Sequence, residues 1–183
     1  MNMSRPSRFA CMIAMCVALP VLVSGNAQAV DIQRVISPGG IEAWLVHDAT
    51  VPIISVNFAF KGGAALDPKG KEGLADMVSG LLDEGAGELD SRAYQAALKD
   101  ISASISFDAG SDRFRGSMRT LSKYRDEAFR LLRLAVTKPR FDAEPVERIR
   151  SQLIAGLLAG LENPRRIARR TWYKTVFPNH PYG

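Results

Sequence analysis

The stretch from Lys71 to Gly87, KEGLADMVSGLLDEGAG, constrains the fold most, because it predicts one amphipathic helix with two chemically different faces. Apolar side chains recur there with the i, i+3, i+4, i+7 spacing of a core-facing stripe. These are Leu74, Met77, Val78 and Leu81. The opposite face gathers Glu72, Asp76, Ser79 and Asp83, with Gly80 at its edge. We expect the first face to pack and the second to be available for chemistry.

The first 29 residues have the features of an export signal and are set apart from the fold. Arg5 and Arg8 form a basic start, residues 9–23 form an apolar run, and Ala27-Gln28-Ala29 is a small-x-small cleavage site. The run is shorter than the ~20 residues that a membrane-spanning helix needs, and it contains Pro20. A cleaved signal peptide is therefore favoured over a membrane span.

Cleavage after Ala29 gives a periplasmic or secreted product that consists of residues 30–183. Both cysteines, Cys11 and Cys16, lie in the leader, so the mature chain forms neither a disulfide nor a thiolate metal site. Without the leader's two basic residues, 22 basic and 19 acidic residues remain, a net charge of +3. This mild charge is not typical of a nucleic-acid-binding protein. We expect no nucleic-acid partner and no membrane span in the mature chain.

The mature chain predicts an α+β domain. Three strands are expected first, then two helices, a second hairpin and a run of helices. The expected strands are 32–36, 41–47, 53–60, 102–107 and 113–120, and the expected helices are 71–87, 90–100, 122–137, 144–161 and 165–176. This order favours an antiparallel sheet with helices packed on one face. The last residues, 180–183, add no closing element, so we expect the domain to be incomplete at its C-terminus.

The helix predicted from Lys71 to Gly87 resembles the first zinc-site helix of the insulinase/pitrilysin metallopeptidases. In that family the helix carries the inverted motif H-x-x-E-H. Gly73-Leu74-Ala75 matches the lead-in to that motif. Lys61-Gly62-Gly63, Glu162-Asn163-Pro164 and the terminal His180-Pro181-Tyr182-Gly183 match further marks of the family in the same order. The resemblance covers residues 30–183. It implies that the chain corresponds to the family's N-terminal domain. In the family, a second domain of the same fold follows this one.

Every functional position of the family's zinc site is substituted in this sequence. Asp76, Ser79 and Gly80 occupy the places of the first His, the catalytic Glu and the second His. The family's third ligand is a Glu on a later helix, and the corresponding count reaches Gly156, 76 residues after Gly80. A catalytic zinc needs about three protein donors and an open position for water. The resemblance therefore implies a peptidase scaffold without its reactive groups.

The mature chain holds two histidines, His47 at a strand end and His180 in a loop. They cannot form the i, i+4 pair that the family uses, so both are expected to be surface or structural residues. We predict no catalytic residue and no metal site in this chain. Zinc, the family's cofactor, is expected in a catalytic partner.

The carboxylates of Glu72, Asp76 and Asp83 span three helical turns, so only adjacent ones can share a hard cation such as calcium. A solvated acidic stripe is favoured. Asp83-Glu84 lies near the expected helix C-terminus, where negative charge is unfavourable. A neighbouring cation could offset this charge. The sequence leaves open whether that cation is a metal ion or is an Arg or Lys side chain from a partner or a missing domain.

The predicted last helix carries a basic cluster, Arg165-Arg166 and Arg169-Arg170. A solvated helix face is favoured here over a surface for an anionic partner. Trp172, Tyr173 and Phe177 are expected to fill the core.

The resemblance implies a non-catalytic subunit, or pseudopeptidase, of a periplasmic zinc-peptidase pair. In this heterodimer a homologous zinc-bearing subunit supplies the chemistry, and both subunits enclose unfolded peptide substrates. Two alternatives stay open. One is a metallopeptidase whose active zinc site lies in an unseen second domain, and the other is a non-enzymatic module that binds peptides at an exposed sheet edge.

Overall fold

The computed structural model describes residues 31–182 and divides the chain into two units, residues 1–50 and 51–183. The predicted signal peptide and its cleavage site at Ala29 lie outside the described residues. In the first unit, Ile32–Ile36 (β1) and Glu42–Val46 (β2) form an antiparallel pair, in register from Ile32↔Val46 to Ile36↔Glu42. The Gly40 N–H donates to the Ser37 carbonyl at 2.9 Å and closes the turn. The first predicted hairpin is thus confirmed.

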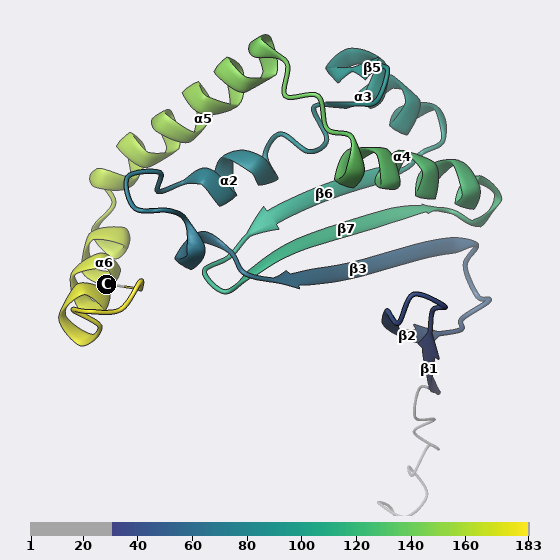
Figure 1. Cartoon of the computed structure of the whole chain (residues 1–183), viewed down its shortest axis with the longest axis horizontal. Helices are drawn as coiled ribbons and strands as arrows, with labels where there is room; N and C mark the ends of the chain where they lie inside the picture. The colour runs from purple at the N-terminus through teal and green to yellow at the C-terminus, as the bar shows by residue number, and fades with distance from the viewer. Residues whose placement is uncertain (1–30, 183) are drawn as a thin grey trace, which may run out of the picture. The chain divides into compact units, whose positions relative to one another are not determined.

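The second unit is built on a three-stranded antiparallel sheet in the order β3-β7-β6. Its strands are Ile53–Lys61 (β3), Ser104–Ala109 (β6) and Arg113–Leu121 (β7), and a small ribbon pairs Gly85–Ala86 (β4) with Leu89–Asp90 (β5). The helices are Leu74–Ser79 (α2), Ser91–Asp100 (α3), Arg125–Thr137 (α4), Ala143–Leu161 (α5) and Pro164–Val176 (α6), with 3-10 turns at Ala64–Leu66 and Ser122–Tyr124. Helices α2 to α5 lie over one face of the sheet (Figure 1). The predicted α+β architecture is confirmed.

Buried and exposed residues alternate along the strands and so distinguish the two faces of this sheet. On β7, Gly116, Met118 and Thr120 are buried, whereas Arg115 and Arg119, on the opposite face, are exposed. Gly116 pairs with Phe58 of β3, and any side chain at position 116 would collide with the Phe58 ring. The apolar face therefore points toward the helices, and the opposite face is polar.

Helices α3 and α4 supply most of the core above the apolar face. Tyr94 of α3 and Leu131 of α4 are fully buried, together with Met118 of β7. The Tyr94 hydroxyl donates to the Leu131 carbonyl at 3.1 Å, and burial raises the pKa of this phenol. Helix α3 begins as predicted, because the Asp90 carboxylate accepts from the Ala93 N–H at 2.8 Å as an N-cap.

The predicted helix from Lys71 to Gly87 is wrong in its length. Helix α2 ends at Ser79, and the chain continues through turns into β4. Leu81 and Leu82 are both buried, at 4% and 8% exposure. On a continued helix these neighbours would point about 100° apart, so the turn lets both enter the core. Asp83 is consequently not on the α2 surface, and the predicted acidic stripe does not form.

Helices α5 and α6 are the least covered elements of the second unit. Leu153, Ile154, Leu157, Leu158 and Leu161 of α5 are exposed, and so is Trp172 of α6. The prediction that Trp172 fills the core is wrong: its ring contacts Tyr173 and Phe177 at centroid distances of 5.1 and 6.3 Å in a surface aromatic cluster. Within residues 31–182, no helix is both long and apolar enough to cross a membrane.

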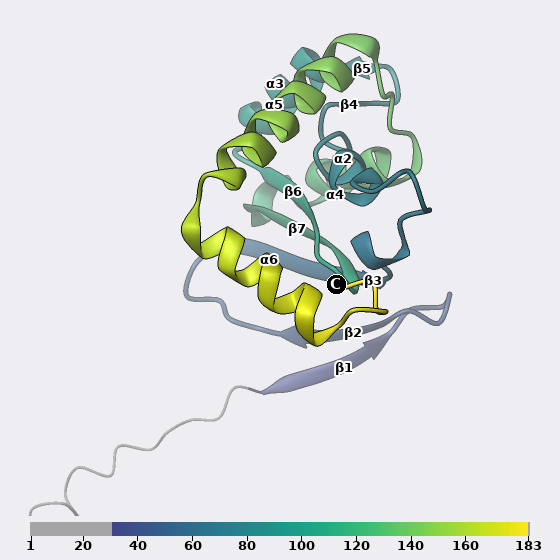
Figure 2. The same cartoon turned by 90° about the vertical axis from the view of Figure 1, so that its left-hand side faces the viewer.

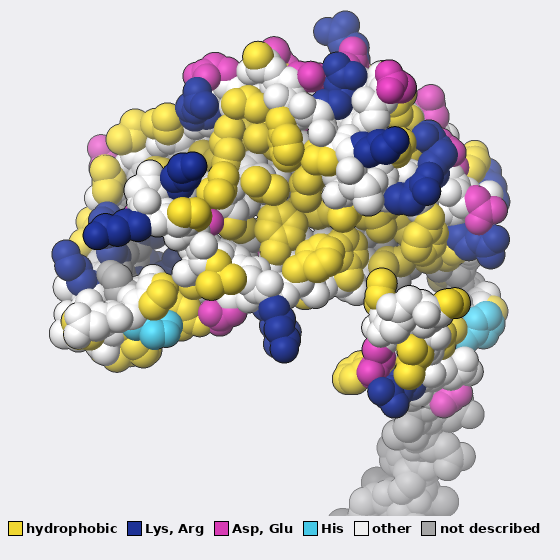
Figure 3. All heavy atoms as spheres, viewed as in Figure 1, with side chains coloured by type: hydrophobic (Ala, Val, Ile, Leu, Met, Phe, Trp, Pro, Cys, Tyr) yellow, Lys and Arg dark blue, Asp and Glu magenta, His cyan; other side chains and the backbone are white. Residues whose placement is uncertain are grey.

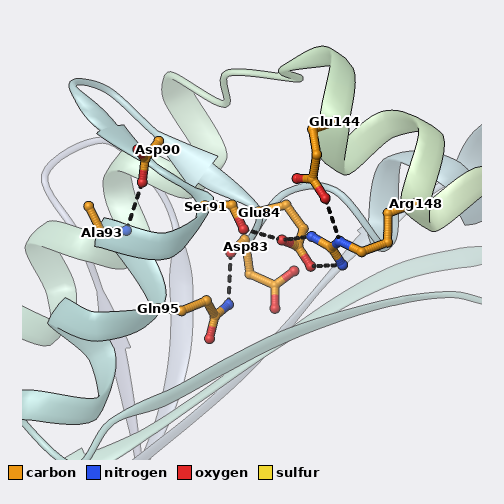
Figure 4. A network of polar contacts seen from close by, with 8 residues as sticks. All are labelled: Asp83, Glu84, Asp90, Ser91, Ala93, Gln95, Glu144 and Arg148. Carbon is orange, nitrogen blue, oxygen red and sulfur yellow. Dashed lines mark hydrogen bonds and ion pairs between the residues drawn. The ribbon is translucent and has the colours of Figure 1, made fainter.

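A polar network fastens α5 to the loop that follows α2 (Figure 4). Arg148 of α5 donates through both terminal nitrogens to Glu84, at 3.1 and 2.6 Å, and through Nε to Glu144 at 3.2 Å. The Ser91 hydroxyl at the start of α3 also donates to Glu84. Chiefly because of Arg148, the pKa of Glu84 is lowered, whereas burial raises the pKa of Asp83.

The cation beside Glu84 is therefore Arg148 of this same chain. The charge of Glu84 is offset without a metal and without a residue from a partner or a missing domain. The Glu84 side chain is only 15% exposed, and the Arg148 side chain 37%. A bidentate pair with this degree of burial stabilises more than a surface ion pair does.

We predict that Glu84→Gln lowers the free energy of unfolding by roughly 1–2 kcal/mol near neutral pH, because it removes the charge from a bidentate pair. The folded-state pKa of Glu84 lies below the ordinary value of about 4.3. Its contribution is therefore complete above that value and is lost as the pH falls through the lowered pKa. Urea unfolding near neutral pH and near pH ~3 measures both effects.

Glu147→Gln is the matched control, because Glu147 pairs with Arg150 at 2.6 Å but both side chains are more than half exposed. We expect a cost below about 0.5 kcal/mol for the control. Equal losses in the two variants would show that the Glu84–Arg148 pair does not fasten α5.

Candidate functional site

The candidate site is α2, which a carboxylate outside the helix holds at its N-terminus. The Asp67 side chain accepts from the Gly73 N–H at 2.8 Å and from the Ala75 N–H at 3.0 Å. These bonds satisfy amides that have no partner within a helix of six residues. Sequence reasoning missed this role of Asp67, and the turn-forming Asp67-Pro68 pair is the signal that points to it.

Asp76 and Ser79 occupy the places of the first His and the catalytic Glu, and both lie on α2. Asp76 is exposed, and its pKa is raised by partial burial of the carboxyl and by the nearby charges of Asp67 and Asp108. The Ser79 hydroxyl donates to the Asp76 backbone carbonyl at 2.8 Å. The serine is therefore satisfied within its own helix. Among residues 31–182, Asp76 belongs to no group of three or more His, Cys, Asp or Glu side chains that could hold a metal ion.

Gly80, in the place of the second His, marks the close approach of α5 to α2. A Cβ atom at position 80 would lie 3.0 Å from Cγ2 of Ile149. Ile149 is nearly buried, at 9% exposure. A side chain at position 80 would therefore crowd the Ile149 methyl, which would have to shift by a few tenths of an ångström.

Gly156, in the place of the third ligand, lies on α5 two turns beyond Ile149, about 10 Å along the helix axis. A Cβ atom there would meet nothing within 4 Å. Its backbone carbonyl accepts from Nη1 of Arg166 at 3.2 Å. The structure thus brings α5 into contact with α2 at Ile149, whereas Gly156 lies two turns away from that contact, and neither Gly80 nor Gly156 supplies a donor side chain.

The residues of this site do not fit a catalytic zinc. Among residues 31–182, no three His, Cys, Asp or Glu side chains cluster closely enough to hold a metal ion. Glu72 lies before α2, and its carboxylate accepts from the Gly70 N–H at 3.0 Å. The three substituted positions of α2 and the glycine of α5 offer one carboxylate and one hydroxyl, far short of the donor set of a zinc peptidase. The assignment of these four positions to the family's motif stays a prediction from the sequence.

Comparison with known proteins gives a sequence relative and several structural neighbours. No family model matches the chain. A relative from Helicobacter pylori (strain ATCC 700392 / 26695), named Non-peptidase homolog YmxG, is 28% identical over 146 residues. The match covers 74% of this chain and 34% of the relative. The chain therefore spans about a third of that relative's length.

Three solved structures that resemble the chain come from proteins described as an inactive peptidase domain, a protease and pitrilysin. A structure described as the peptidase M16 inactive domain from Pseudomonas fluorescens has a TM-score of 0.77 and 26% identity, covering 84% of this chain and 37% of that one. A Helicobacter pylori protease has a TM-score of 0.70 at 18% identity, over 84% of this chain and 37% of its own. Pitrilysin has a TM-score of 0.69 at 22% identity, over 86% of this chain and 17% of its own. These last two similarities concern the fold alone.

The fold, the similarity to a solved domain described as inactive and a relative named as a non-peptidase agree with one another. They identify residues 31–182 as an insulinase/pitrilysin-like domain of the M16 peptidase type in a non-catalytic form.

Proposed function

We propose that this chain is the non-catalytic subunit of a periplasmic zinc-peptidase pair and that it helps to enclose peptide substrates. The observation that carries the proposal is the contact between Gly80 and Ile149. A Cβ atom at position 80 would need the Ile149 side chain to shift by a few tenths of an ångström. This tight contact supports a domain that keeps the architecture of a peptidase without its metal site.

Two further features support the proposal. The sequence begins with a leader that has an export signal's basic start, apolar run and small-x-small site ending at Ala29. A solved inactive M16 domain also shows that the fold persists without activity. The zinc that cleavage requires then comes from a homologous subunit. A zinc site in an unseen second domain, and a peptide-binding module without a peptidase, are the competing outcomes of the test.

The first test places a histidine in the space that Ile149 fills. We predict that Gly80→His lowers the free energy of unfolding by about 1–3 kcal/mol, because the ring overpacks the α2–α5 contact. Gly156→His is the matched control, because its Cβ atom would enter open space and replacing a helical glycine is favourable. Urea unfolding of both variants measures the difference.

In a Gly80→His/Ile149→Ala double variant, the cost of the histidine is expected to shrink, because the alanine vacates the space. A Gly80→His variant that is as stable as Gly156→His and binds zinc would show that the site is not closed.

The second test asks whether cleavage needs two chains. We predict that the full-length protein, captured from the exporting cell, brings with it a homologue that carries an intact H-x-x-E-H motif. Peptide cleavage by the eluate should be chelator-sensitive and should require both chains. Cleavage by the repurified protein alone would contradict the proposal and favour a second-domain site, and an inactive protein without a partner would favour the peptide-binding module.

A further inference from the structure

A basic groove lies in the second unit where α6 meets the β6–β7 turn. Its volume is about 1170 Å³. The turn residues 110–112 line one side, and Leu157 and Leu161 of α5 and Ile167 of α6 supply an apolar wall. We call this feature the arginine groove, and Figure 2 faces the side of the molecule that carries α6.

Five arginines line the arginine groove. They are Arg113 and Arg115 of β7 and Arg166, Arg169 and Arg170 of α6. Figure 3 shows Lys and Arg side chains at this end of the second unit as well as at its other end. In the part of the chain that the structure describes, none of the five forms an ion pair with a carboxylate. Like charges around one concavity repel one another, and an anionic ligand would remove that repulsion.

The single acidic side chain that lines the groove, Asp112, is engaged by a phenol. The Tyr182 hydroxyl donates to the Asp112 carboxylate, and this interaction raises the pKa of Tyr182. The Tyr182 ring in turn lies against His180 and Phe177, at centroid distances of 4.5 and 5.8 Å. These contacts tie the segment after α6 to the β6–β7 turn and hold the two arginine-bearing elements together.

One arginine is also fixed by the backbone. Arg166 donates to the Gly156 carbonyl at 3.2 Å, and its side chain covers Gly160 of α5. Its guanidinium is thus partly preorganised, which lowers the entropy lost when a ligand binds. Arg165, the neighbouring residue on α6, does not line the groove.

We propose that the arginine groove binds an acidic polypeptide segment, one in which Asp or Glu side chains alternate with apolar ones. Guanidinium groups pair with carboxylates through two parallel hydrogen bonds, and the leucine and isoleucine wall accommodates apolar side chains. Nucleic acid fits less well, because the tyrosines of the groove pack edge to face within the aromatic cluster and offer no open stacking platform. A flat bilayer does not enter a concave site. The inference does not depend on pairing with a peptidase.

The test is fluorescence anisotropy with the full-length protein and a labelled short peptide of alternating Glu and Leu. We expect saturable binding that weakens with salt and is absent for the same peptide with Gln in place of Glu. Arg169→Gln/Arg170→Gln should weaken binding roughly tenfold or more. Arg133→Gln/Arg165→Gln removes the same charge from exposed positions outside the groove and should leave the affinity within about twofold.

A second pair, Arg113→Gln/Arg115→Gln on β7, should cause the same loss as the α6 pair. It keeps the proposal testable if the substitutions in α6 unfold that helix, which circular dichroism reports. Equal weakening in groove and control variants would overturn the proposal, and so would an absence of binding by the unmodified protein. Tighter binding of oligothymidylate or of phosphatidylglycerol vesicles would overturn it as well.

Discussion

The contact of α5 with the C-terminal end of α2 is the constraint on which the candidate site depends. Gly80 has no side chain, so Ile149 lies against the backbone there. The neighbouring residue, Arg148, reaches Glu84 in the following loop, and Glu84 also accepts a hydrogen bond from Ser91 at the start of α3. One apolar contact and one charged pair therefore join three elements. In the same contact, Ile149 lies beside position 80, which is assigned to the second His of the motif.

The sequence predicted those parts of the fold that local patterns determine. Alternation along β3 and β7 follows from burial of one sheet face, and the Asp90 cap follows from local backbone chemistry. The end of α2 was predicted incorrectly, because it depends on tertiary packing. A long amphipathic pattern continues past Gly80, but Leu81 and Leu82 both reach the core only if the helix stops.

The candidate site, like the fold, could be predicted from the sequence only in part. The substituted motif positions are visible in the sequence, since they depend on residue identity alone. The pairing of Glu84 with Arg148 is not, because 64 residues separate the partners and no local pattern links them. The exposure of Trp172 is likewise a tertiary property: the pattern of α6 is amphipathic, yet its aromatic residues gather at the surface around Tyr182.

Zinc stoichiometry of the purified chain tests most directly the claim that packing has replaced the metal site. The protein is equilibrated with zinc, freed of unbound metal and assayed by elemental analysis. No stoichiometric zinc should remain, because Gly80 and Gly156 supply no donor and Ile149 occupies the space between α2 and α5. One tightly bound zinc per chain, lost on Asp76→Ala, would contradict the account.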